Sequence, residues 1–359
     1  MKLRWIWLPS ELRYSRSGGT AVQSTYLGGS TMIYLLRSGT IALVLSVSLS
    51  AAAKEIATKQ ISARIELHSI DTLTISDQQF LKADTSGKQV NVSGELRVAQ
   101  GSGRLPVVVM LHGSGGIGPG IDMWSREFAE LGISSFIIDS FTGRGLTSTV
   151  LDQSQLGRLN MILDAYRALG ILSKHPRVAP ERIALMGFSR GGQGTLYASL
   201  KRFHQAWNKS GAEFAAYMPF YPDCTTSYIS DTDVVDRPIR IFHGTADDYN
   251  PVAPCKAYVE RVRAAGHDVQ LTEYPNTWHV FDNPIGNQTP TVLKDAPTTR
   301  HCVIQEQPVG LLIDAATKEP FTYSDSCVEH DPHVAYNPVA AQAAKQSVKD
   351  LLRTVFKLN

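Results

Sequence analysis

Gly187-Phe188-Ser189-Arg190-Gly191-Gly192 is the stretch of the sequence that decides the fold. The residues before it, Arg182–Met186, are mostly apolar and predict a short buried strand. The residues after it, Gln193–Leu200, predict a helix with small side chains on one side. Ser189 therefore stands at a sharp turn from strand to helix, the context that gives a G-x-S-x-G pattern chemical meaning. The flanking glycines permit the strained backbone and the close packing that such a turn needs.

A serine hydroxyl needs a base, and a group that orients the base, before it becomes a good nucleophile at neutral pH. In strand–turn–helix folds of this kind an acidic residue and then a histidine follow the serine along the chain. Asp247 comes just after the predicted strand Ile239–Phe242, and His279 comes just after the predicted strand Val269–Tyr274. The order indicates a catalytic triad of Ser189, Asp247 and His279. The alternative is a glycine-rich turn with a purely structural role.

Asp248 is the alternative candidate for the acidic residue of the triad. We favour Asp247, because the second acid of such a pair more often caps the following turn. His267 stands in a Gly-His-Asp turn and is interpreted as a loop residue.

A glycine-rich loop, His112–Gly118, follows the apolar strand predicted over Leu105–Leu111. Such a loop supplies one backbone N–H to an oxyanion hole, and the residue after the nucleophile supplies another. The expected donors are the amides around Ser114 and of Arg190. A phosphate-binding loop is the alternative, but the pattern G-x-x-x-x-G-K-[ST] is missing.

Together these segments resemble the dienelactone hydrolase family of α/β-hydrolases. The resemblance runs from about Val92 to Phe281, plus a final helix, and rests on the following motifs: Val107–Gly116, Gly187–Gly192, Tyr221–Cys224, His243–Pro251 and His279–Phe281. It implies the same triad. The hydrolases that name the family use cysteine as the nucleophile, so Ser189 marks a serine variant and favours a broader carboxylic-ester hydrolase. Arg190 is large for its position and would bind an acidic substrate group or form a salt bridge on the helix surface.

Regular alternation of strands and helices predicts an α/β fold with a mostly parallel, doubly wound sheet flanked by helices. The strands Arg64–Ser76 and Val90–Ala99 alternate like antiparallel edge strands. The other predicted strands are 107–111, 133–138, 182–186, 214–218, 239–242 and 269–274. The predicted helices are 123–131, 152–174, 191–203, 253–265 and 339–356.

The N-terminal residues indicate export. The apolar run Ile41–Leu49 is short for a membrane span, Arg37 precedes it, and Ser50–Ala53 follows as a cleavage signal. We therefore expect residues 1–53 to be an extension and signal peptide cleaved near Ala53, which would leave residues 54–359 as the hydrolase domain of a periplasmic or secreted protein. Met32 could be the true start, and an uncleaved membrane anchor is the alternative.

Four cysteines lie beyond the expected cleavage site, an even number that suits an oxidising compartment. We predict the disulfides Cys224–Cys255 and Cys302–Cys327; four reduced cysteines are the alternative, and a zinc site is disfavoured because no C-x-x-C spacing exists. The second pair lies in an insertion, residues 282–337, rich in Pro, Thr, Asp and Asn. This insertion would form either a wall of the pocket or a loop that extends into solvent.

The sequence thus predicts an exported serine hydrolase that cleaves small carboxylic esters or lactones through an acyl-enzyme and needs no metal or organic cofactor. The 359 residues carry 35 basic and 33 acidic side chains, a balance that offers no face for nucleic acid. No lasting membrane association is expected unless the signal segment stays uncleaved, and the oligomeric state is left open. The alternatives are a prolyl-oligopeptidase-type peptidase, disfavoured because no large N-terminal propeller precedes the domain, and a catalytically inactive binding protein.

Overall fold

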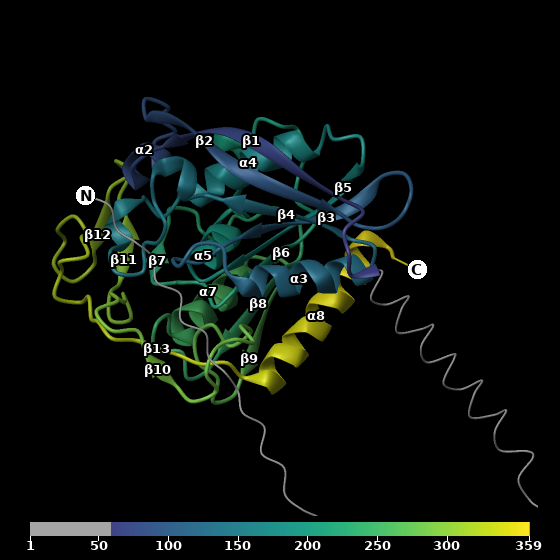
Figure 1. Ribbon diagram of the computed structural model, residues 1–359. Coiled ribbons are helices and arrows are strands. Elements are labelled where there is room, and N and C mark those ends of the chain that lie inside the picture. Colours follow the sequence, from purple (N-terminus) through teal and green to yellow (C-terminus); the bar gives the residue numbers. More distant parts are fainter. Residues whose placement is uncertain (1–58, 359) are drawn as a thin grey trace, which may run out of the picture. The chain divides into compact units, whose positions relative to one another are not determined.

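An eight-stranded sheet runs through the centre of the computed structural model, which describes residues 59–358 (Figure 1). Its strand order is β1-β2-β4-β3-β5-β6-β8-β9. β2 is antiparallel to both of its neighbours, and all other neighbouring strands are parallel. The strands are β1 (Arg64–Thr74), β2 (Lys88–Val98), β3 (Leu105–Leu111), β4 (Ser134–Asp139), β5 (Val178–Phe188), β6 (Tyr217–Phe220), β8 (Ile239–Gly244) and β9 (Val269–Tyr274). This is the α/β-hydrolase fold that the sequence predicted.

β3 shows why the strands are apolar throughout. Its alternate side chains point to opposite faces of the sheet, and both faces are buried. Val107, Val109 and Leu111 belong to one hydrophobic core, whereas Val108 and Met110 belong to the other. The sequence of a strand that is covered on both faces is therefore a continuous apolar run.

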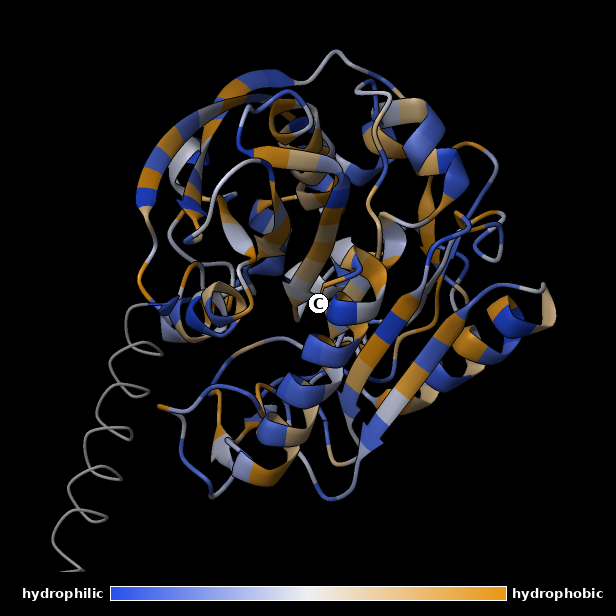
Figure 2. Ribbon diagram, turned by 90° about the vertical axis from the view of Figure 1, so that its right-hand side faces the viewer, coloured by the Kyte–Doolittle hydropathy of each residue, from blue (hydrophilic) through white to orange (hydrophobic). Residues whose placement is uncertain are grey.

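Helices cover both faces of the sheet (Figure 1). They are α2 (Asp77–Leu81), α3 (Pro119–Glu130), α4 (Asn160–Leu172), α5 (Arg190–Tyr197), α6 (Lys201–Trp207), α7 (Val252–Ala264) and α8 (Pro338–Phe356). α3 and α8 lie together on one face, and α4 to α7 pack on the other. Figure 2 shows hydrophobic residues in the central strands and alternating hydrophilic and hydrophobic bands along the outer helices.

Several predicted elements differ from the structure, three of them as follows. The helix expected to begin at Asp152 begins only at Asn160, because residues 153–155 form a separate 3-10 turn (η2). The helix expected over 191–203 is two helices, separated where the backbone of Leu200 is extended. The strand expected over 214–218 is β6, shifted toward the C-terminus. Each error concerns a boundary and leaves the order of elements intact.

Residues 282–337 contain short strands with no helix between them. They are β10 (Thr291–Val292), β11 (Ile304–Glu306), β12 (Leu312–Asp314) and β13 (His333–Val334). β10 pairs with β13, and β11 pairs with β12 and with β7 (Thr226–Ser227) of the hydrolase fold. The segment is therefore joined to the main fold by backbone hydrogen bonds.

The predicted extension, signal peptide and cleavage site of residues 1–53 lie outside the described residues. Within the described part of the chain, no helix is both long enough and apolar enough to cross a membrane.

Candidate active site

Ser189 occupies the turn between β5, which ends at Phe188, and α5, which begins at Arg190. Its backbone has φ 54° and ψ −114°, a strained conformation for a residue with a side chain. The neighbouring glycines make this turn possible. A Cβ on Gly187 would lie 2.1 Å from the carbonyl oxygen of Gly191, and a Cβ on Gly191 would lie 2.4 Å from that of Leu111. The glycines thus let the turn pack closely against β3.

His279 lies in the loop after β9 and contacts both other members of the predicted triad. Its Nε2 is 2.9 Å from the Ser189 Oγ, and its Nδ1 is 2.7 Å from Asp247 Oδ2. A carboxylate only accepts hydrogen bonds, so Nδ1–H is the donor to Asp247. In the neutral ring Nε2 then accepts the hydroxyl proton of Ser189. The arrangement suits transfer of a proton from serine to histidine.

The acid is held in place by the loop after β8. Asp247 Oδ1 accepts hydrogen bonds from the amides of Tyr249 and Asn250, at 2.9 and 2.8 Å, while Oδ2 faces His279. Asp247 and His279 are both buried, with 5% and 1% of their surfaces exposed. Burial excludes water from the hydrogen bond between them and strengthens their electrostatic interaction.

Asp248 points away from His279 and binds the 282–337 segment. Its carboxylate accepts hydrogen bonds from the backbone N–H and from Nδ1 of His333, both at 2.8 Å. Arg300 also forms an ion pair with it at 3.4 Å. The expectation that the second acid caps the following turn is therefore wrong, because Asp247 itself caps it.

The glycine-rich loop lies directly beside Ser189. A Cβ on Gly113 would lie 3.5 Å from the Cβ of Ser189. His112 holds the loop: its Nε2 accepts the amide of Ser140 at 3.2 Å, and its Nδ1 lies 2.7 Å from the carbonyl oxygen of Gly113. Burial lowers the pKa of His112 and favours the neutral ring that these two bonds require. The sequence pattern identified the loop but missed this role of His112.

The two predicted oxyanion donors both belong to segments that adjoin Ser189. Ser114 follows Gly113 in the glycine loop and lines the same cavity as Ser189. Arg190 is the first residue of α5, and amides in the first turn of a helix have no acceptor within the helix.

The side chain of Arg190 is buried, contrary to the predicted salt bridge on the helix surface. Only 6% of the residue is exposed. Its guanidinium donates to the side chain of Gln153 at 2.6 Å and to the carbonyl oxygen of Leu156. Burial lowers its pKa. The arginine holds the loop between η2 and α4 against the start of α5.

A buried carboxylate that the sequence analysis did not identify lies behind His279. Asp282 accepts hydrogen bonds from Trp124 Nε1 at 2.8 Å and from the hydroxyl of Tyr221 at 2.7 Å. The ring of Tyr221 packs on His279 with 4.6 Å between centroids, and Tyr249 packs on it at 4.8 Å. Burial raises the pKa of Asp282. No spacing rule marks this residue, and only its position three residues after His279 could have drawn attention to it.

A cavity of about 330 Å³ opens beside Ser189 and His279. Its walls are largely apolar and include residues from the glycine loop, from α3 and from the 282–337 segment. The apolar lining consists chiefly of Ile121, Val150, Phe188, Tyr221, Leu293 and Val334. Of the two expectations for the insertion, the structure supports a wall of the pocket.

Both predicted disulfides are present. Cys224–Cys255 joins the segment after β6 to α7, and Cys302–Cys327 closes a loop within the 282–337 segment. All four cysteines are therefore paired. The described part of the chain has one group of three or more His, Cys or acidic side chains that are close enough to share a metal ion. Its residues lie on β1 and after α4, and none of them is a cysteine.

The fold is that of an α/β-hydrolase, with Ser189 at the turn between β5 and α5. The chain belongs to the dienelactone hydrolase family, whose model matches residues 94–356. It is similar to a dienelactone hydrolase-like promiscuous phosphotriesterase, P91, from metagenomic libraries, with a TM-score of 0.52 and 17% identity over 81% of this chain and 98% of that chain. It is also similar to a candidate dienelactone hydrolase from Klebsiella pneumoniae, with a TM-score of 0.50 and 14% identity over 80% of this chain and 98% of that chain. No curated protein sequence matches the chain.

Proposed function

We propose that this protein is an exported serine hydrolase that cleaves small carboxylic esters or lactones through an acyl-enzyme. The observation that carries the proposal is the hydrogen-bonded series from Ser189 through His279 to Asp247 at the wall of an apolar cavity. Membership of the dienelactone hydrolase family supports hydrolysis of ester-type bonds.

In the proposed mechanism, His279 Nε2 takes the hydroxyl proton as Ser189 Oγ attacks the carbonyl carbon. Asp247 keeps the imidazole in the required tautomer and stabilises the imidazolium. The amides near Ser114 and of Arg190 bind the tetrahedral oxyanion, each worth on the order of 3 kcal/mol. His279 then returns the proton to the departing alcohol, and a water molecule releases the acyl group by the same steps.

The cavity supports a small substrate with an apolar body. Its volume of about 330 Å³ lies near the lower end of the range for ligand pockets. Its glycines leave room beside the nucleophile, and its aromatic and aliphatic lining favours uncharged acyl groups or lactone rings. This shape argues against long peptides, and so against the peptidase alternative.

Two disulfides in the described residues support the export half of the proposal, because such bonds persist in oxidising compartments. N-terminal sequencing of protein from the exported fraction tests it, with a start near Lys54 as the expected result. A chain recovered only from the cytoplasm would contradict export without bearing on hydrolysis.

A fluorophosphonate probe tests the enzymatic half of the proposal. The expected result is stoichiometric labelling of Ser189, identified by peptide mass, together with hydrolysis of short-chain esters or lactones in a substrate panel. Lack of labelling by folded protein would favour the alternative of an inactive binding protein. Labelling with no ester or lactone hydrolysis, but with cleavage of peptides, would favour the peptidase.

A further inference from the structure

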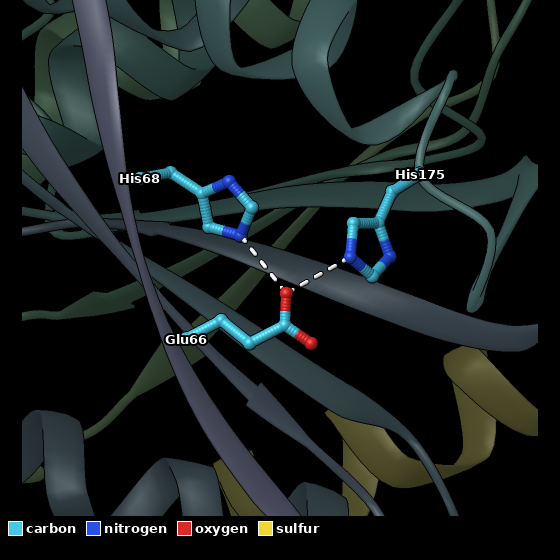
Figure 3. Close-up of side chains that lie close together, drawn as sticks. All are labelled: Glu66, His68 and His175. Atoms are coloured by element: carbon cyan, nitrogen blue, oxygen red, sulfur yellow. Dashed lines mark hydrogen bonds and ion pairs between the residues drawn. The ribbon is translucent and has the colours of Figure 1, made fainter.

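Three metal-ligating side chains converge at the edge of the sheet opposite the catalytic loops. Glu66 and His68 lie two residues apart on β1 and therefore on the same face of the strand. His175 follows the end of α4. Figure 3 shows both imidazole rings directed at one oxygen of the Glu66 carboxylate: His175 Nε2 is 3.0 Å from Oε2, and His68 Nε2 is 3.4 Å from it.

The cluster is largely shielded from solvent yet open enough to admit an ion. The side chains of Glu66, His68 and His175 are 21%, 19% and 10% exposed. His68 Nε2 is buried and has no hydrogen-bond partner, because its contact with Glu66 does not have hydrogen-bond geometry. A buried polar atom without a partner is costly. A ligand at the centre of the cluster would satisfy it.

Two of the three separations between the ligand atoms suit a tetrahedral ion. Ligand atoms about 2.0–2.2 Å from zinc lie about 3.3–3.5 Å from one another. The two distances to Glu66 Oε2 are close to this value, and all three ligand atoms lie within 4.8 Å of one another. We propose that Glu66, His68 and His175 form a binding site for zinc or a similar divalent transition-metal ion, with water as the fourth ligand. Imidazole and carboxylate together are a usual ligand set for such ions.

Three contacts compete with the ion, and the first is the hydrogen bond from His175 Nε2 to Glu66 Oε2 at 3.0 Å, whose proton the ion would replace. The Arg64 guanidinium forms an ion pair with Glu66 Oε1 at 2.5 Å, and the amide of Arg177 donates to His175 Nδ1 at 3.2 Å. Zinc on Nε2 moves the ring proton to Nδ1, so the Arg177 amide must turn away. Arg64 is 57% exposed and can swing into solvent. The bound ion would join β1 to the connection between α4 and β5, a structural role remote from Ser189.

The test uses the full chain without an affinity tag, stripped with a chelator and titrated with zinc chloride in a calorimeter. One zinc ion per chain and a rise in melting temperature with zinc are expected, because an ion that binds only the folded state stabilises it. His68→Gln and His175→Gln should each weaken binding by at least about 100-fold, since loss of an outer partner alone costs about 10–100-fold. Arg64→Ala should tighten binding, because it removes the competing cation.

His301→Gln is the matched control, because His301 pairs with a single carboxylate, Glu329, at 3.4 Å and is 63% exposed. It should leave zinc binding unchanged. Binding that persists in both cluster variants, or no binding at millimolar zinc, would overturn the proposal. If the cluster variants fail to fold, anomalous diffraction from wild-type crystals grown with zinc decides: a peak between the three ligand atoms supports the site, and its absence there refutes it.

Discussion

Asp248 and His333 are joined by two hydrogen bonds of 2.8 Å, one from the backbone N–H and one from the ring of the histidine. His333 belongs to β13, and the next residue, Val334, lines the cavity beside Ser189. The adjacent aspartates therefore have different partners, since Asp247 holds the imidazole of His279 and Asp248 holds the wall of the pocket.

This division predicts opposite kinetic signatures for the two aspartates. Asp247→Asn should lower kcat by about 10³–10⁴-fold, because the wrong imidazole tautomer is then favoured. Asp248→Asn should leave kcat nearly intact and raise KM, because it loosens the wall without touching the reacting groups. Steady-state kinetics on one good ester substrate measures both. An exchange of the two phenotypes would reassign the acid.

Ser189→Ala should lower kcat by about 10⁴-fold or more while the protein stays folded, because the nucleophile is removed. Circular dichroism and thermal unfolding check the fold, and ester hydrolysis gives the rate. Ser114→Ala is a useful comparison: it keeps the backbone amide that we assign to the oxyanion hole, so its loss of activity should be far smaller. More than a tenth of wild-type activity in Ser189→Ala would show that another residue attacks.

The order of elements and the loops that hold Ser189, Asp247 and His279 could be predicted because they depend on local patterns. Strong apolar runs mark the strands, and the glycines around Ser189 mark the turn. The partners of Arg190 and Asp282 could not be predicted, because they come from segments far apart in the sequence. Arg190 contacts a loop more than 30 residues earlier, and Asp282 contacts a tryptophan 158 residues earlier. Local patterns carry no information on such packing.

The contact between α3 and α8 gives a prediction about stability and pH. Lys345 and Lys349 of α8 form ion pairs with Glu127 of α3, and these side chains are about one-fifth exposed. Burial alone would raise the pKa of Glu127, but the hydrogen bonds and charges of the two lysines hold it below its ordinary value. A lowered carboxylate pKa contributes stability above pH 4.5, and this contribution is lost as the pH falls through the folded-state value.

Glu127→Gln should therefore lower the free energy of unfolding by about 0.5–1 kcal/mol at pH 7, as expected for a partly exposed ion pair. The difference from wild type should shrink as the pH falls below 4.5 and through the lowered pKa of Glu127, when the wild-type carboxyl is also protonated. Urea unfolding at several pH values measures this. Asp350→Asn, which removes an exposed carboxylate of α8 paired only with groups on the same helix, is the control. A difference that stays constant with pH would mean that Glu127 acts through packing.

The Cys302–Cys327 disulfide gives a prediction that links the 282–337 segment to substrate binding. It closes a loop with a sequence separation of 25 residues and should stabilise the protein by roughly 3–4 kcal/mol in the chain-entropy model. Because Leu293 and Val334 of the same segment line the cavity, replacing both cysteines by alanine should raise KM more than it lowers kcat.

Removal of the Cys224–Cys255 disulfide is the comparison. This disulfide ties α7 to the segment after β6, next to the loop of Asp247, so its removal should lower kcat as well. Thermal unfolding and steady-state kinetics of the two double variants, with peptide mapping under non-reducing conditions, measure these effects. Equal effects on KM and kcat in both variants would show that the disulfides act only on global stability, and that the wall of the pocket does not depend on its own crosslink.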